Sequence, residues 1–189
     1  TKRLLQKLNR EVTFSIIALS AGRTFSPELY FKLSDALYFI SHHRKFVQIT
    51  DLSFVTKVQT SDGFVYQFQT EARAYIRKYG LRIVRLAHQV LHTHFQEKFE
   101  NGDDLAEVEA IYHLNALEWE RGIHQWVETF ANALADARFT QCRALLEVLP
   151  DLRIETAYWQ ARIKAALVEY TAQTGDEATA RLHLEHAIA

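Results

Sequence analysis

From Thr70 to its last residue, the sequence repeats apolar residues three or four positions apart, and no alternating strand pattern interrupts this spacing. Such spacing is typical of amphipathic helices. Only two prolines and six glycines occur in 189 residues, so few helix breakers are available. We therefore expect a mostly α-helical chain in this region, with helices at about 70–79, 81–99, 104–118, 120–136, 138–149, 153–173 and 176–188. Thr70 and Asp104 are the expected caps of the first and third of these helices.

The first part of the sequence is mixed. Apolar residues between Leu4 and Ala21 predict one or two helices, and Gly22 is a suitable stop. Ser26 can cap a following helix, because its hydroxyl can accept from a free backbone N–H, and Pro27 is pre-shaped for the first helical position. Residues 40–52 give no clear preference for helix or strand.

A β-hairpin is predicted at about 54–69. Phe54 to Gln59 alternate between apolar or β-branched and polar residues, and residues 64–68 form a second strand-like run. Asp62-Gly63 between them is a strong signal for a tight hairpin turn. A lone hairpin is marginal in water, so this one is expected to pack against the neighbouring helices.

Charge divides the chain into two parts. Residues 1–79 hold 12 Lys and Arg against 6 Asp and Glu, a net charge of +6, whereas residues 80–189 hold 10 against 17, a net charge of −7. This asymmetry indicates two modules with different surfaces. We expect a first domain at 1–79 that contains the hairpin and a helical-repeat domain at 80–189.

The second domain has features of a tetratricopeptide-like array. Thr174-Gly175-Asp176 separates two predicted helices, and the small residues Ala180 and Ala187 would allow those helices to cross closely. The segment Arg138 to Pro150 has the features of another second helix of such a pair. Repeats of this kind stack into a superhelix with a concave binding face.

The chain ends and the single cysteine bear on cellular context. Thr1 stands where a natural start would have methionine, and the sequence ends inside a helical pattern, so we expect a fragment of a longer protein. Cys142 is the only cysteine and fits a small buried residue in a reducing, cytoplasmic setting. No apolar run approaches the length of a membrane span, so no membrane partner is expected.

Phe68, Arg73, Tyr75 and Ile76 lie in and after the second predicted strand, and Ala110-Ile-Tyr-His-Leu114 occurs in the helical array. With the order of elements, these residues resemble the winged-helix segment and helical sensor of the STAND class of signalling ATPases, which includes NACHT, NB-ARC and MalT-like proteins. This resemblance implies a winged-helix module, a tetratricopeptide-like superhelix, and an ATP- or ADP-binding domain before Thr1. Gln69 occupies the position of the family's phosphate-sensing histidine; an amide can donate to phosphate but carries no charge.

Motifs for chemistry within the chain are weak. Gly22-Arg23-Thr24 lacks the spacing of a phosphate-binding loop, so no cofactor is expected in this fragment. His88 and His92 share a helical face, but the intervening residues do not form a zinc-protease motif, and we predict no metal site. No catalytic signature is present, so the chain is predicted not to be an enzyme; a stand-alone enzyme is the least favoured reading.

Two sets of residues are candidates for partner binding. The first is a basic stripe after the hairpin, which could contact an acidic protein surface or DNA phosphates, or could be a solvated helix face: Arg73, Arg77, Lys78, Arg82 and Arg85. The second is a set of aromatic residues, which are either core or anchors on a concave face: Tyr112, Trp119, Trp126 and Trp159.

Two functional hypotheses follow. The first is a non-catalytic regulatory and protein-interaction fragment that relays the binding of a partner or ligand to an upstream nucleotide switch. The alternative is a DNA-binding winged-helix transcription regulator with a helical effector or dimerisation domain, whose duplex binding would weaken steeply with salt. The expected recognition helix, which follows Ser26, argues against DNA because it is acidic and apolar.

Overall fold

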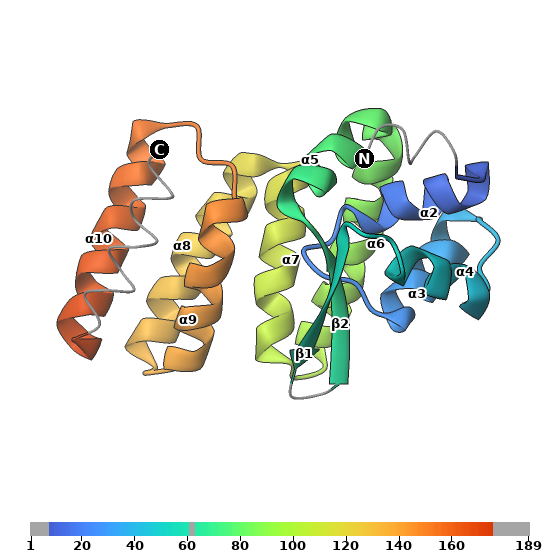
Figure 1. Ribbon diagram of the computed structural model, residues 1–189. Helices are drawn as coiled ribbons and strands as arrows, with labels where there is room; N and C mark the ends of the chain where they lie inside the picture. Colours follow the sequence, from blue (N-terminus) through green and yellow to red (C-terminus); the bar gives the residue numbers. More distant parts are fainter. Residues whose placement is uncertain (1–7, 61–62, 176–189) are drawn as a thin grey trace. The chain divides into compact units, whose positions relative to one another are not determined.

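The structure is a computed structural model that describes residues 8–60 and 63–175 (Figure 1). The described residues are mostly helical with one small two-stranded antiparallel sheet, which confirms the coarse prediction. The predicted helix at 176–188 lies outside the described residues. The elements are α2 (Arg10–Leu19), α3 (Pro27–Leu37), α4 (His43–Thr50), β1 (Val55–Thr60), β2 (Gly63–Phe68), α5 (Thr70–Tyr79), α6 (Leu81–Glu100), α7 (Asp104–Leu117), α8 (Trp119–Ala135), α9 (Phe139–Val148), the 3-10 turn η1 (Leu149–Asp151) and α10 (Ala157–Thr174).

The chain divides into two compact units, residues 1–91 and 92–189. The division falls within α6, twelve residues after the boundary predicted at 79/80. The residue before α6 packs closely in the first unit: a Cβ atom on Gly80 would lie 2.6 Å from Cγ2 of Ile17 in α2. The change in net charge therefore marks the two modules only approximately.

The predicted hairpin is present, with its register shifted relative to the expected turn. Val55 pairs with Phe68 and Thr60 pairs with Gly63, so the glycine begins β2 instead of lying inside the connection. Gly63 has a φ of 130°, which a residue with a side chain adopts only with strain. Residues 61–62, which include the other half of the predicted turn, lie outside the described residues.

An aromatic core holds the hairpin to the helices of the first unit. Phe25 pairs with Tyr66 through both backbone hydrogen bonds, with N to O distances of 2.7 and 2.8 Å. The Phe25 ring lies 4.8 Å from that of Phe68 and 6.2 Å from that of Phe46 in α4. The expectation that the hairpin packs on neighbouring helices is therefore confirmed, since buried aromatic pairs contribute more than their area alone.

The start of α3 follows the predicted cap. Ser26 is the N-cap, its hydroxyl accepts from the N–H of Leu29 at 3.3 Å, and Pro27 is the first helical residue. Residues 40–52, which gave no clear preference, form α4 over His43–Thr50.

Two other caps lie one residue before the predicted position. Asp103, and not Asp104, caps α7, and its Oδ1 accepts from the N–H groups of Leu105 and Ala106. Gln69, and not Thr70, is the N-cap of α5, without a side-chain hydrogen bond. Asp103 and Asp104 have the same capping propensity, so the sequence cannot rank them, and helix ends assigned from sequence vary by a residue or two.

The second unit is a packed array of helices. Helix α8 packs against α7, α9 and α10, and α7 also packs against α9. Their shared core is apolar and includes the fully buried Trp126, Phe130 and Leu145. Helix α10 begins at Ala157, four residues later than predicted, because residues 153–156 form an extended approach and Thr156 caps the helix. Within residues 8–60 and 63–175, no helix is both long and apolar enough to cross a membrane.

Candidate functional site

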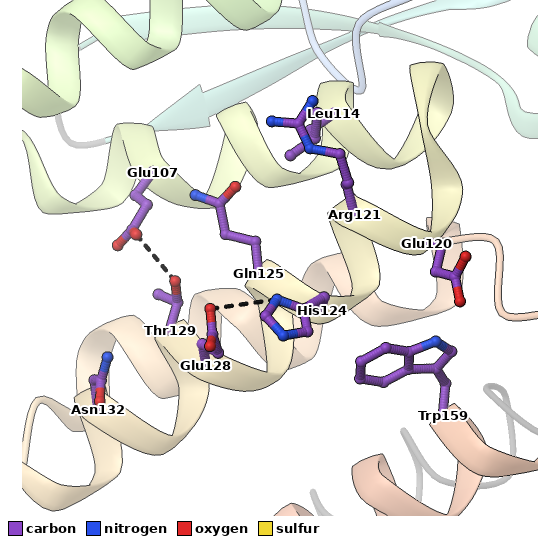
Figure 2. Close-up of a pocket in the computed structure, with 10 residues that line it drawn as sticks. All are labelled: Glu107, Leu114, Glu120, Arg121, His124, Gln125, Glu128, Thr129, Asn132 and Trp159. Carbon is purple, nitrogen blue, oxygen red and sulfur yellow. Dashed lines mark hydrogen bonds and ion pairs between the residues drawn. The ribbon is translucent and has the colours of Figure 1, made fainter.

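The second unit has an open groove along the outward face of α8, with a volume of about 730 Å³ (Figure 2). Helix α8 supplies most of the lining, α7 borders the groove on one side, and Trp159 of α10 lies on the other. The described lining residues are Glu107, Leu114, Glu120, Arg121, His124, Gln125, Glu128, Thr129, Asn132 and Trp159. Eight of these ten side chains are polar or charged, so the groove presents hydrogen-bonding groups more than apolar surface.

The helical repeat of α8 explains why these side chains face outward. Its buried apolar side chains recur three or four positions apart and form the core: Ile123, Trp126, Val127, Phe130, Ala133 and Leu134. The exposed positions Glu120, His124, Glu128 and Asn132 form one row on the opposite side. Beside this row lie exposed Arg121, half-buried Gln125 and Thr129, which is 6 % exposed and faces Glu107. An apolar stripe on one face therefore leaves a row of polar side chains on the other.

Glu107 of α7 is held in position at one edge of the groove. Its Oε1 accepts from the hydroxyl of Thr129 at 2.9 Å, and its Oε2 accepts from Nε2 of Gln141 at 2.9 Å. Gln141 is itself buried, and its Oε1 accepts from Arg138 at 2.6 Å. These bonds join α7, α8 and α9, so the carboxylate is fixed by neighbouring helices and is half-buried between them.

On the other side of the groove, His124 links α8 to α10. Its Nδ1 lies 3.3 Å from Oε2 of Glu128, and its ring meets the Trp159 indole edge-on with centroids 5.6 Å apart. Trp159 is 7 % exposed, so most of its surface anchors α10 in the core while the remainder borders the groove (Figure 2). The aromatic contact fixes one wall of the groove.

The predicted basic stripe is not one surface. The Arg77 guanidinium donates to the carbonyls of Ser20 and Ala21, at 2.7 and 3.0 Å, and so satisfies carbonyl groups at the end of α2. Arg73 is half-buried, whereas Lys78, Arg82 and Arg85 are exposed on α5 and α6. Arg77 is therefore a structural residue in this fold, and the last three residues of the predicted stripe remain open to solvent.

The aromatic candidates also separate. Trp126 and Tyr112 are buried in the core, with 0 % and 3 % of their surfaces exposed, so they cannot act as exposed anchors. Trp119 is half-buried and packs against the same core. Of these four candidates, Trp159 borders the groove. The polar strip on α8 was not among the sequence candidates, because polar residues at helical spacing also mark an ordinary solvated face.

The remaining sequence candidates have simple structural roles. Gln69 is exposed at the start of α5, and its backbone N–H donates to the carbonyl of Phe54 at 2.9 Å. Cys142 is buried in the second core, where burial raises the pKa of its thiol. Among the described residues, no group of three or more His, Cys, Asp or Glu side chains is placed to hold a metal ion.

His88 of α6 is buried in the first unit and makes its stability depend on pH. Burial, together with the positive charges of Arg77 and Arg73, lowers the pKa of His88 from 6.5 to about 3. The folded unit therefore keeps this ring neutral while the unfolded chain protonates it below pH 6.5. The contribution of the neutral His88 ring to the stability of the first unit is present above pH 6.5 and is lost progressively as the pH falls toward 3.

We expect the free energy of unfolding of the first unit to fall by about 2 kcal/mol between pH 7 and pH 5. Urea unfolding followed by circular dichroism at both pH values measures it. A His88→Gln variant should lose this pH dependence, whereas His43→Gln, at an exposed position of α4, should keep it. If the His88→Gln variant kept the same pH dependence as the unaltered protein, His88 would not be its source.

Comparisons with protein-family models, with curated proteins and with solved structures give no match to this chain.

Proposed function

We propose that this chain is a non-catalytic regulatory and protein-interaction region of a larger STAND-like signalling ATPase. The second unit binds a protein partner through the groove on α8, and the first unit passes this event to an upstream nucleotide-binding domain. The observation that carries the proposal is the open groove of about 730 Å³, lined by polar side chains that neighbouring helices hold in place.

The first unit supports the winged-helix part of the proposal. Helices α2, α3 and α4 precede the hairpin β1–β2, and Phe25 between α2 and α3 adds a one-residue bridge to the hairpin. The hairpin is thereby fixed to the helices by backbone hydrogen bonds as well as by aromatic packing. A rigid module of this kind can act as one body in a domain rearrangement.

The second unit supports the tetratricopeptide-like part. Along the chain from α7 to α10, α7 packs against α8 and α9, and α8 packs against α9 and α10. Stacked helical hairpins likewise pack each helix against near neighbours in the chain. Helix α8 supplies most of the groove lining, with α7 on one side and Trp159 of α10 on the other.

The proposed mechanism is a shift in population. A partner that fills the groove stabilises the arrangement of α8 and α10 that fits it, and it can shift an equilibrium only by its difference in affinity for the two states. The chain would thus report partner binding to the ATPase domain without performing chemistry itself.

The DNA-binding alternative gains little from the structure. The exposed residues of α3, the expected recognition helix, are Pro27, Glu28, Phe31, Lys32, Asp35 and Ala36. With two acidic residues and one lysine, this face has a net negative charge, which opposes phosphate binding. Major-groove readers normally present Arg, Lys, Asn or Gln to the base edges. Arg77, one of the five basic candidates, is bound to the end of α2.

Photocrosslinking at the groove tests the interaction. One variant carries a photoreactive amino acid in place of half-buried Gln125, which lines the groove. A second variant carries it in place of exposed Arg143, which lies on α9 outside the groove. Both variants are produced in cells that naturally express the protein. We expect a discrete protein adduct from position 125 and none from position 143. Equal adducts from both positions, or none from either, would contradict a role for the groove.

The ATPase part of the proposal has a separate test. The DNA on the 5′ side of the Thr1 codon is sequenced and translated in the same reading frame. A glycine-rich loop ending in Lys-Ser or Lys-Thr would support the proposal, because that loop binds nucleotide phosphates. A start codon directly before Thr1 would contradict it and would leave the groove as the site of an independent adaptor.

A further inference from the structure

The groove on α8 is acidic. Glu107, Glu120 and Glu128 line it, and of its ten described lining residues only Arg121 carries a full positive charge. That charge is already balanced, because Nη1 of Arg121 lies 3.0 and 3.1 Å from the two carboxylate oxygens of Glu118. Glu120 has no ion-pair partner among the described residues. The groove therefore presents negative charge to whatever enters it.

The two exposed carboxylates have a defined spacing. Glu120 and Glu128 lie in the same row of α8, eight positions apart, on either side of His124. Since an α-helix rises about 1.5 Å per residue, their Cα atoms are about 12 Å apart. An extended peptide advances about 3.3 Å per residue, so four of its residues cover about 13 Å. Alternate side chains point the same way, and residues four apart therefore face the same surface.

We infer that the groove binds an extended segment of a partner protein that carries two basic side chains four residues apart, one at Glu120 and one at Glu128. Trp159 lies beside the row and offers an apolar wall to the aliphatic part of a basic side chain (Figure 2). Gln125 and Asn132 can exchange hydrogen bonds with the peptide backbone. This inference rests on the proposed function, since it names the chemistry of the partner.

Other occupants fit the same surface less well. An acidic or phosphorylated segment would meet three glutamates, and like charges brought together oppose binding. A purely apolar segment would cover the charged row while gaining contact only with Leu114 and Trp159 among the apolar lining residues. Charge complementarity thus selects a basic segment, and the spacing of the carboxylates selects its register.

The test uses the full chain and a peptide that carries fluorescein on its N-terminal amine, fluorescein-Ser-Arg-Ala-Ser-Ala-Arg-Ser-amide, in a fluorescence anisotropy titration at low salt. Three comparison peptides replace both arginines with citrulline, replace both with glutamate, or place the two arginines next to each other. We expect saturable binding of the first peptide. The citrulline peptide should bind about tenfold more weakly, the adjacent-arginine peptide about fivefold more weakly, and the glutamate peptide not measurably.

Matched variants identify the site. Glu120→Gln and Glu128→Gln remove one charge each from exposed positions, so the fold should be retained, which circular dichroism checks. Each should weaken binding of the arginine peptide about fivefold. Glu169→Gln removes the same charge from an exposed position of α10, ten residues from Trp159, and should leave binding unchanged.

The outcomes separate this inference from the proposed function. Equal binding of the arginine and citrulline peptides, or unchanged binding by both groove variants, would overturn the inference. A protein adduct at position 125 together with no peptide preference would leave the interaction function standing while the basic-segment inference fails. No peptide binding and no adduct would overturn both.

Discussion

Replacing Gly122 with alanine is expected to lower the free energy of unfolding of the second unit by about 3 kcal/mol. Gly122 is the position where α8 crosses α7. A Cβ atom there would lie 2.3 Å from Cα and 2.4 Å from the backbone N of Asn115. These are backbone atoms, which cannot rotate away as a flexible side chain could, so the two helices would have to separate.

Helix propensity acts in the opposite direction and is too small to compensate. Alanine is favoured over glycine inside a helix by about 1 kcal/mol. The loss of packing exceeds this gain because moving α7 from α8 also disturbs the hydrogen bond between Thr129 and Glu107 at the groove edge. The variant should therefore lose binding at the groove as well as stability.

Tryptophan fluorescence during urea unfolding measures this effect selectively. All three tryptophans, Trp119, Trp126 and Trp159, belong to the second unit. Gly102→Ala is the control: its φ is 97° and a Cβ there would meet nothing within 4 Å, so it adds backbone strain without a clash, about 1 kcal/mol. A Gly122→Ala variant as stable as the unaltered protein would show that the helices cross less closely.

The local elements of this chain follow from its sequence because they depend on nearby residues. Apolar spacing predicts α7 and α8 to within two residues, and Ser26-Pro27 predicts the start of α3. The alternating run around Val58 predicts the hairpin. Errors of one residue occur where neighbours have similar propensities, as at Asp103 and Asp104, since the sequence cannot rank them.

The groove depends on contacts between distant residues, which the sequence does not encode locally. Trp159 reaches His124 only because α10 packs back against α8, past the intervening α9. Likewise, nothing near Arg77 indicates that its guanidinium will bind carbonyls 56 and 57 positions earlier in the chain. The polar row of α8 could be recognised as an exposed face, but its carboxylates become parts of a groove only through the helices beside it.

The second large effect on stability is expected at Asn115 of α7, which bonds the start of α8 and the segment that leads into α10. Replacing Asn115 with leucine is expected to lower the free energy of unfolding of the second unit by about 3 kcal/mol. Asn115 is 3 % exposed, and its side-chain amide donates to the carbonyls of Trp119 and Arg153, at 2.9 and 3.1 Å. Its Oδ1 accepts from the N–H of Arg153 at 2.7 Å.

Leucine has a similar volume but leaves three backbone groups without these bonds. Each buried polar group that loses its partner costs about 1–3 kcal/mol, and the gain from burying a leucine offsets only part of this. The Arg153 segment leads directly into α10, so releasing it should also shift Trp159 at the groove wall. We therefore expect weaker binding of the arginine peptide in addition to lower stability.

Asn101→Leu provides the matched control for this prediction. Asn101 also donates its amide to a backbone carbonyl, that of Glu97 at 2.7 Å, but it is exposed at the end of α6. Water can replace that bond, so its loss should change the free energy of unfolding by about 0.5 kcal/mol at most. Urea unfolding followed by tryptophan fluorescence compares the two variants. Equal effects at the two positions would mean that Asn115 does not fasten α10 to the turn between α7 and α8, and that the groove wall is held by the core alone.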